Sequence, residues 1–285
     1  MMQTHFDCVP CFVRQVAEAV ALATEDAIVR ESVMRRMLRK IAKAEWMGPP
    51  PVMGQNLHHS ICDMTGNNDP YKEVRREMNR MASELIPRMR EFLRDSPNCR
   101  EDAVRVAIIG NLLDAGAKTQ ASTADFPRKL DEMLTRQLRG DVTALFQEAE
   151  RASHILYLAD NAGEIFFDRL LIEKLPYGKI TVAVRGGPTI NDAIMEDAES
   201  AGIPEITCVI DNGYDAPGTI LKNSSLEFRR IFDQADLIIA KGQGNYETLS
   251  DCEKQIWFLL NVKCPLIANH IGEKMGSLVV KKSNF

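Results

Sequence analysis

Three oxygen-bearing side chains, Asp160, Asn161 and Asp192, follow two apolar runs of the chain, and no cysteine or histidine adjoins them. Carboxylate and amide oxygens are the ligands that a hard cation such as Mg²⁺ or Mn²⁺ prefers, and such an ion keeps several waters. The bound ion can take a phosphate oxygen as a further ligand, polarise phosphorus and lower the pKa of bound water. We therefore predict that these three residues are metal ligands and catalytic residues for phosphoryl transfer, with Co²⁺ and Ni²⁺ as further candidate ions.

Cationic side chains and a glycine-rich turn occur at similar positions. Arg185 and Lys241 directly follow two apolar runs, and Lys263 lies further along the chain. Each could neutralise phosphate charge, while exposed backbone amides at an expected helix start after Lys241 could donate hydrogen bonds. The expected substrate-binding residues are Arg185, Lys241, Gly242, Gln243, Gly244, Asn245 and Lys263.

Structural roles account for several of the same residues. Asp160 and Asn161 could cap the helix that follows a strand, as Asp and Asn frequently do. Asp192 also fits the first turn of a helix, where the helix dipole favours negative charge. The Gly-Gln-Gly turn is a weak phosphate signal, because Glu247 replaces the third glycine of the dinucleotide fingerprint. The functional interpretation depends on the coincidence of several polar loops at one predicted sheet edge.

Several familiar reaction motifs are absent from the sequence. It contains neither a GxxxxGK[ST] nucleotide-phosphate loop nor a GxSxG nucleophile turn. Ala162 stands two residues after Asp160, so the Asp-x-Asp pair of an aspartyl-phosphate mechanism is missing. We therefore expect a metal-activated water as the nucleophile, and direct attack of Asp160 on phosphorus stays open as the alternative.

The elements that position these residues follow from the spacing of apolar residues. From 12 to about 151 the spacing is three and four residues, which predicts a helical domain over 1–151. A Gly-Pro-Pro-Pro run separates two of its helices, with His58 and His59 expected at a solvated helix start. Asn111 and Asp114, on an otherwise apolar helix, could reach the cleft or form interdomain hydrogen bonds. The clearest predicted helices are 13–22, 28–46, 71–93, 102–113 and 126–138.

After about residue 153 the pattern changes to short, continuous apolar runs that alternate with helical stretches. Such runs suit strands buried on both faces, so we predict a doubly wound, mostly parallel α/β domain over 152–285. Ligands of these sheets gather at the carboxyl ends of the strands, where the polar residues above occur. The predicted strands are 154–159, 180–184, 206–210, 237–240, 265–268 and 278–280, the last as an antiparallel edge. The predicted helices between them are 164–174, 191–201, 225–233 and 246–258.

Composition limits the classes of function. The 285 residues are 45% hydrophobic and 26% charged, enough apolar sequence for a sizeable core. A formal net charge of −5 argues against general affinity for nucleic acid. No apolar run approaches the roughly 20 residues of a membrane span, and the start of the sequence lacks the pattern of a secretory signal. We therefore expect a cytoplasmic protein without a nucleic-acid or membrane partner.

Seven cysteines, an odd number, are scattered along the chain and are expected to be reduced thiols. Cys8 and Cys11 form a CxxC, a spacing that occurs in zinc half-sites and redox pairs but also where thiols simply pack. The residues that could complete a zinc site are His58, His59, Cys62 and Cys99.

In their order along the chain, these motifs resemble the damage-control phosphatases, a family long catalogued as a domain of unknown function. The match covers most of the sequence, and its helical half is similar to the short prokaryotic and archaeal branch. The segments that carry the resemblance are FDCVPC (6–11), DPYKE (69–73), GNLLD (110–114), DNAGE (160–164), RGGPTIND (185–192), DAPGT (215–219) and KGQGNYE (241–247).

The resemblance implies a helical domain packed on a Rossmann-like domain, a divalent metal, and phosphatase activity toward damaged or side-product phosphometabolites such as sugar phosphates. By position, the family's metal ligands correspond to Asp160, Asn161 and Asp192. Its phosphate-binding loop corresponds to 241–245, with Lys263 as a further lysine. Larger eukaryotic relatives have an acidic residue in this loop where the present chain has glutamine, so the resemblance leaves substrate choice open.

Two alternatives stay open at this point. The sheet type is shared with S-adenosylmethionine-dependent methyltransferases, but only Gly163 follows the first strand, where a glycine-rich loop should admit that cofactor. A noncatalytic phosphometabolite sensor would use the same pocket as a phosphatase, and turnover separates the two. For both the phosphatase and the sensor, the expected partner is a small phosphorylated metabolite.

Overall fold

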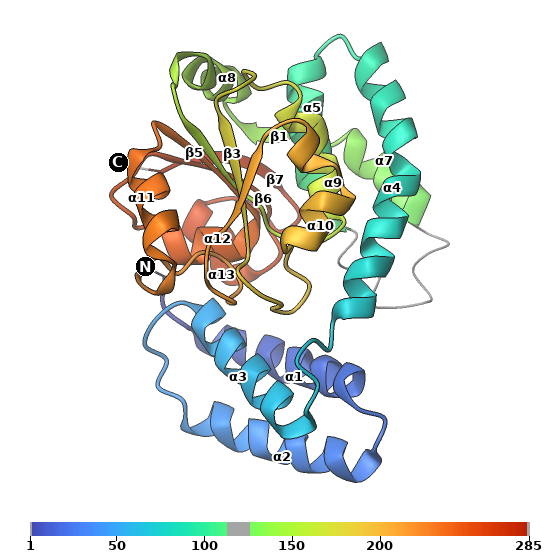
Figure 1. The fold of residues 1–285 in the computed structure, drawn as a ribbon, viewed down its shortest axis with the longest axis vertical. Helices are drawn as coiled ribbons and strands as arrows, with labels where there is room; N and C mark the ends of the chain where they lie inside the picture. The colour runs from blue at the N-terminus through green and yellow to red at the C-terminus, as the bar shows by residue number, and fades with distance from the viewer. Residues whose placement is uncertain (1, 113–125, 284–285) are drawn as a thin grey trace.

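The structure is a computed structural model that describes residues 2–112 and 126–283. It has the expected α/β architecture: N-terminal helices precede a mostly parallel sheet with helices between its strands (Figure 1). None of the described helices is both long and apolar enough to cross a membrane. Asp114 lies outside the described residues.

Seven strands of the described chain form one sheet in the order β1-β7-β6-β5-β2-β3-β4. β7 is antiparallel to β6, and the other neighbours are parallel. The chain proceeds from β2 to β4 in one direction and then places β5 on the other side of β2, so the strand order reverses there. Ligand sites of open α/β sheets lie at the carboxyl end of such a reversal. The strands are β1 (Leu138–Gly140), β2 (Ile155–Leu158), β3 (Ile180–Val184), β4 (Cys208–Asp211), β5 (Leu237–Lys241), β6 (Ile256–Asn261) and β7 (Leu278–Lys282).

Helices cover both faces of the sheet and extend beyond one end of it. A short 3₁₀ turn, η2 (Gly110–Leu112), follows α5. The helices are α1 (Val9–Ala23), α2 (Ala27–Lys43), α3 (Pro50–Thr65), α4 (Lys72–Asp95), α5 (Cys99–Ile109), α7 (Phe126–Leu134), α8 (Val142–Arg151), α9 (Glu164–Ile172), α10 (Met195–Ser200), α11 (Leu226–Gln234), α12 (Gly242–Leu249) and α13 (Pro265–Ile271).

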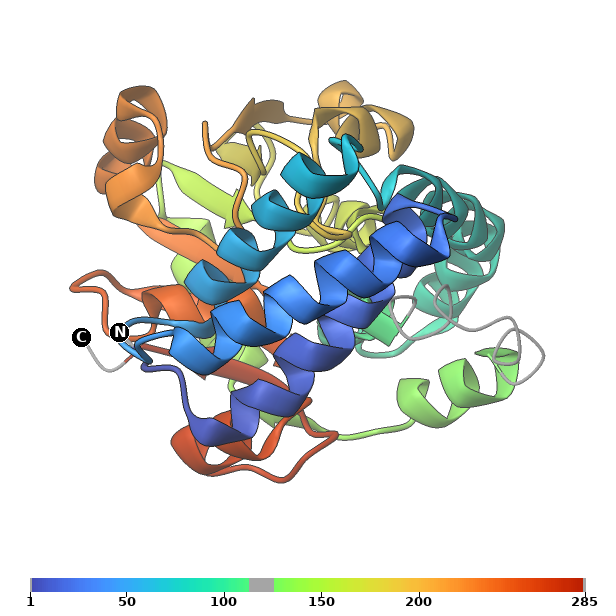
Figure 2. The same cartoon turned by 90° about the horizontal axis from the view of Figure 1, so that it is seen from below.

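The first three helices, α1, α2 and α3, pack on one another at the bottom of Figure 1. Seen from below in Figure 2, they lie side by side across that end of the molecule. Phe12, Val33 and Ile61 each contribute to their apolar cluster, one from each helix. Ile190, from the loop after β3, is buried in the same cluster. The three helices therefore form a cap over the carboxyl edge of the sheet.

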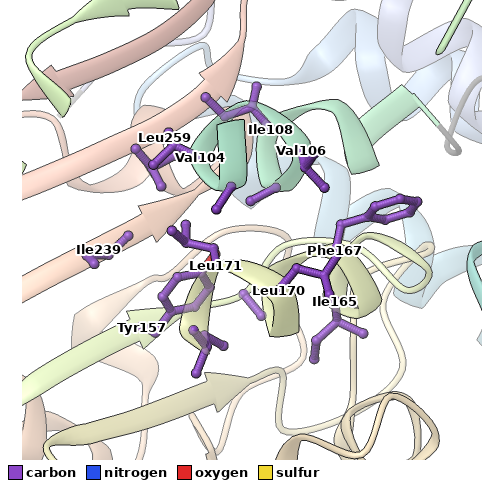
Figure 3. Close-up of a cluster of buried hydrophobic side chains, with 14 of the residues drawn as sticks. Val104, Val106, Ile108, Tyr157, Ile165, Phe167, Leu170, Leu171, Ile239 and Leu259 are labelled. Atoms are coloured by element: carbon purple, nitrogen blue, oxygen red, sulfur yellow. The ribbon is translucent and has the colours of Figure 1, made fainter. Parts of the chain in front are cut away.

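A second, larger core joins α4, α5 and α9 to one face of the sheet (Figure 3). Val104 and Ile108 of α5 belong to this core together with Leu170 and Leu171 of α9 and Tyr157 of β2. α5 precedes residue 151 and α9 follows it. Helices from both expected domains therefore share one core with the sheet, and the division into 1–151 and 152–285 stays a prediction of the sequence.

Three expectations for the elements after residue 245 are wrong, each for a physical reason. Residues 265–268 begin helix α13, not a strand, because Pro265 suits the first turn of a helix, and Gly272 ends it in a left-handed conformation. The helix expected at 246–258 ends at Leu249, and the apolar run after it forms β6 inside the sheet. β7 is antiparallel as expected but is not the edge, because β1 pairs with its outer side.

Candidate active site

The residues expected to bind metal meet at the carboxyl ends of β2 and β3. Asp160 and Asn161 follow β2, and the chain after β3 folds back along them. A backbone hydrogen bond from Ala193 N to Asp160 O (2.8 Å) fixes this return. Asn161 and Asp192 pair across an isolated antiparallel bridge. The structure therefore brings all three expected ligands to one point of the sheet edge.

Two asparagines hold two carboxylates together at this point. Nδ2 of Asn161 lies 2.7 Å from Asp160 Oδ2 and 2.9 Å from Glu164 Oε2. Nδ2 of Asn111 lies 3.1 Å and 2.6 Å from the same two oxygens. Gly110 permits this approach, since a Cβ there would lie 3.2 Å from the Cα of Glu164. The sequence indicated Asn111 as a candidate for the cleft but assigned no role to Glu164, although this residue ends the DNAGE segment of the resemblance and begins helix α9.

Arg185 lies between the two carboxylates expected to bind metal. Its Nε donates to Asp192 Oδ2 at 2.7 Å, and its Nη2 lies 3.8 Å from Asp160 Oδ1. The side chain is buried, and Nη2 has no hydrogen-bond partner. Burial raises the pKa of Asp160 well above its usual range; Glu164 and Asp192 raise it further, while Arg185 opposes the rise. Several buried carboxylates beside one guanidinium make an environment that favours an added cation.

Lys241, the last residue of β5, is fully buried. Its Nζ donates to Glu164 Oε1 at 2.8 Å, to the carbonyl oxygen of Ala107 at 2.9 Å and to the carboxylate of Asp168. Tyr157 Oη donates to the same carboxylate at 2.8 Å. The two carboxylates outweigh burial and raise the pKa of Lys241. All three donor hydrogens of the ammonium group have protein acceptors, so this lysine contacts the site through Glu164.

The turn after Lys241 lies against Asp160. Gly242 has a φ of +76°, and a Cβ added there would lie 1.9 Å from Asp160 Oδ2. The turn opens α12, so its first backbone N–H groups have no acceptor within that helix. Asn245 is buried; its Nδ2 donates to Lys241 O at 2.8 Å, and its Oδ1 accepts from Thr219 Oγ1 at 2.7 Å. The side chain of Asn245 therefore holds the turn in place.

Lys263 is exposed and lies close enough to the carboxylates for its charge to lower the pKa of Asp160. Its backbone N donates to Gln243 Oε1 at 3.4 Å. Nε2 of Gln243 donates to Glu247 Oε1 at 3.0 Å. Gly244 approaches the chain at 218, where its added Cβ would lie 3.1 Å from the backbone nitrogen. Gln243 therefore links the glycine-rich turn to the segment that carries Lys263.

The oxygen donors of the site suit a hard divalent cation by their chemistry. Asp160 and Asp192 offer carboxylate oxygens. Asn161 Oδ1 accepts from Asn191 Nδ2 at 2.8 Å, so Asn161 would offer its oxygen to an ion after its amide is turned over. Within 2–112 and 126–283, no group of three or more His, Cys, Asp or Glu side chains is already arranged as a metal shell.

The cysteines are free thiols, and the CxxC has a neighbour that the sequence did not suggest. His58 and Cys62, proposed as its partners, contact each other within α3 at 3.7 Å. The expectation of a solvated helix start is wrong for His58, which is 4% exposed, because α3 begins earlier, at its prolines. Cys264 instead lines the same cavity as Cys8 and Cys11.

Comparison with known proteins gives consistent matches over nearly the whole chain. A family model described as the damage-control phosphatase ARMT1-like domain matches residues 4–279. A damage-control phosphatase from Pyrococcus horikoshii is 35% identical over 290 residues, covering 100% of this chain and 99% of the relative. One from Archaeoglobus fulgidus is 34% identical over 280 residues, covering 96% and 97%. The crystal structure of a DUF89 family protein from Pyrococcus horikoshii has a TM-score of 0.91 at 34% identity, with 100% of both chains covered.

Proposed function

Because the chain belongs to the damage-control phosphatase ARMT1-like domain family, we propose that it is a metal-dependent phosphatase that hydrolyses small phosphorylated metabolites. Homology supports the phosphatase class, since relatives that match along their whole length carry that name. One observation carries the metal-dependent form of the proposal: Asp160, Asn161 and Asp192 converge where the strand order reverses, beside the buried Arg185.

In the proposed site Asp160, Asn161 and Asp192 would hold Mg²⁺, Mn²⁺, Co²⁺ or Ni²⁺. When bound, the ion would polarise the phosphoryl group and lower the pKa of an attacking water. Arg185 donates its unpartnered Nη2–H to a phosphate oxygen, and Lys263 neutralises further phosphate charge.

The remaining residues position these groups. Backbone N–H groups at the start of α12 donate to the phosphate. Asn111 holds the carboxylates of Asp160 and Glu164 in place, and Lys241 fixes the carboxylate of Glu164. In the reaction the oxygen of water bonds to phosphorus, the ester P–O bond breaks, and the leaving alcohol takes up a proton. The products are an alcohol and inorganic phosphate.

The proposal is tested by phosphate release from small phosphomonoesters with metal-stripped protein, before and after each divalent ion is added. We expect turnover that the ion restores and that Asp192→Asn lowers by more than about 100-fold, beyond the usual loss from changing a residue that only supports a ligand. Asp211→Asn is the matched control, because Asp211 is an exposed carboxylate at the end of β4.

Two outcomes would contradict the proposal. Metal-dependent turnover that survives in Asp192→Asn would remove this residue from the site. No phosphate release with any ion would overturn the phosphatase; saturable binding of a phosphomonoester would then favour the sensor, and binding of S-adenosylmethionine would favour the methyltransferase.

A further inference from the structure

A cavity of about 200 Å³ lies where the cap meets the loops at the carboxyl edge of the sheet. Phe12 lines it from α1, and Leu266 lines it from α13 on the sheet side. Gln243 also lines it, and this residue directly follows Gly242, whose backbone abuts Asp160. Gly242, which contacts the candidate metal site, is therefore followed directly in the chain by a residue of the cavity wall.

The lining of the cavity is mostly apolar or weakly polar. Prolines of α3 and the thiols of Cys8, Cys11 and Cys264 make up much of it. Its charged members are the acids Asp7 and Glu247, and no lysine or arginine is among the described residues that line it. Gln15 and Gln243 also line it, and Gln243 already bonds to Glu247 and to the backbone nitrogen of residue 263. A polyol would give up water here for few remaining hydrogen-bond partners, which is unfavourable. A second anionic group would meet carboxylates without a cation. The lining therefore suits an apolar group that carries no negative charge.

Ile190 lines this cavity and belongs to the loop that carries Asp192. Its side chain lines the cavity and packs on the apolar cluster of α1, α2 and α3. Its φ is +47°, a left-handed conformation that β-branched residues rarely adopt, and no other described non-glycine residue has a positive φ. Strain of this kind persists where the surroundings enforce it and occurs most often at functional sites. The loop therefore holds a strained apolar side chain in the cavity wall, two residues before a candidate metal ligand.

We propose that this cavity receives the alcohol portion of the substrate, which makes the preferred substrates phosphomonoesters of short aliphatic or aromatic alcohols without a second anionic group. Ile190 is then a specificity-determining residue that contacts the leaving alcohol. This inference rests on the proposed phosphatase function and adds the substrate class. It favours a hydrocarbon leaving group over a sugar.

The first test compares n-propyl phosphate with glycerol 1-phosphate, which has the same carbon chain and two added hydroxyl groups. With the metal-restored enzyme, kcat/KM should favour propyl phosphate by about tenfold or more, because buried hydroxyls without partners are costly. Along the series from methyl to hexyl phosphate, kcat/KM should rise about fourfold for each methylene that enters the cavity, until the cavity is full. Leaving-group acidity is nearly constant along the alkyl series, so the slope reports on contact with the cavity.

Two variants test whether the preference for alkyl chain length arises in this cavity. Ile190→Ala enlarges the cavity, so the most favoured chain should become longer. Leu266→Ala, on the opposite wall, should do the same and serves if the loop variant fails to fold. Leu226→Ala is the matched control, because Leu226 is 74% exposed on α11, and it should leave the chain-length profile unchanged. As a readout without turnover, saturation-transfer NMR on metal-free protein should detect 1-hexanol but not glycerol, and Leu266→Ala should weaken the hexanol signal.

The outcomes separate this inference from the function on which it rests. Equal or better turnover of glycerol 1-phosphate, or a flat alkyl series, overturns the assignment of the cavity while metal-dependent turnover upholds the phosphatase. Turnover of no ester overturns the phosphatase function and this inference together. An alkyl preference that neither cavity variant alters also overturns the assignment.

Discussion

Replacing Lys241 by methionine tests whether its buried ammonium group supports the site or binds the substrate. In the structure, Nζ donates to Glu164, to Asp168 and to the carbonyl oxygen of Ala107, and none of the side chain is exposed. Methionine keeps much of the side-chain volume and removes the charge. Glu164 and Asp168 then become buried carboxylates that have lost a shared cation.

The magnitude follows from the cost of breaking a buried ion pair. Removing one partner destabilises a protein by about 3–5 kcal/mol, because the remaining charge is desolvated and unpaired. Protonation limits this cost: burial raises the pKa of Asp168 to about 6 even with Lys241 present, and loss of the lysine raises it further. We therefore expect Lys241→Met to lower the free energy of unfolding by about 3–5 kcal/mol above neutral pH and by less in mild acid.

Urea denaturation of the metal-free protein measures the stability, and initial rates of phosphate release measure the activity. Lys263→Met is the matched control, because Lys263 is exposed and its charge acts on Asp160 in the same site. Its free energy of unfolding should change by no more than about 0.5 kcal/mol, the usual range for surface substitutions. Its KM should rise, because the substrate phosphate loses a cation.

One result would refute this reasoning. If Lys241→Met keeps the wild-type free energy of unfolding and only raises KM, the ammonium group binds substrate directly, and the buried contacts with Glu164 and Asp168 are not what Lys241 contributes.

Gly242→Ala should abolish metal-dependent turnover and lower Tm more than Gly178→Ala. The two glycines have nearly the same φ, +76° and +77°, but an added Cβ lies 1.9 Å from Asp160 Oδ2 at Gly242 and has nothing within 4 Å at Gly178. Equal effects would contradict the role of the close approach. Burial raises the pKa of Glu247 from 4.5 to about 7, so the folded protein favours the protonated form of this residue. The free energy of unfolding therefore falls as pH rises from 4.5 to about 7. Glu247→Gln should therefore raise the free energy of unfolding by up to about 3 kcal/mol near pH 8 and by about zero near pH 4.5, measured by urea titration; a difference that does not depend on pH would contradict the assignment.

Much of the sheet could be predicted because its central strands are local features of the sequence. The apolar runs expected at 154–159, 180–184 and 237–240 form β2, β3 and β5, with ends that differ by at most one residue. Neighbouring parallel strands share an edge at their carboxyl ends, so the sequence also placed Asp160, Asp192 and Lys241 near one another. The helix at 265–271 and the strand β6 were assigned wrongly, because a short apolar run has the same composition in either element.

The contacts that each side chain makes depended on tertiary packing. Leu237, Ile239 and Lys241 share one face of β5 by the two-residue period of a strand, a pattern that is visible in the sequence. The sequence does not say which helices cover that face. In the structure α5 and α9 cover it, so Lys241 meets Glu164 and Asp168 in the core.

The sequence by itself determined the alternation of strand and helix, the polar residues at the strand ends, and the likeness to a phosphatase family, because these are local patterns in chain order. Only the tertiary structure decided that Asn111 contacts Glu164, that Ile190 enters the cap, and that Cys264 shares a cavity with the CxxC. These contacts join side chains distant in sequence. They depend on how close-packed helices and loops fit together, which no single segment of the chain specifies.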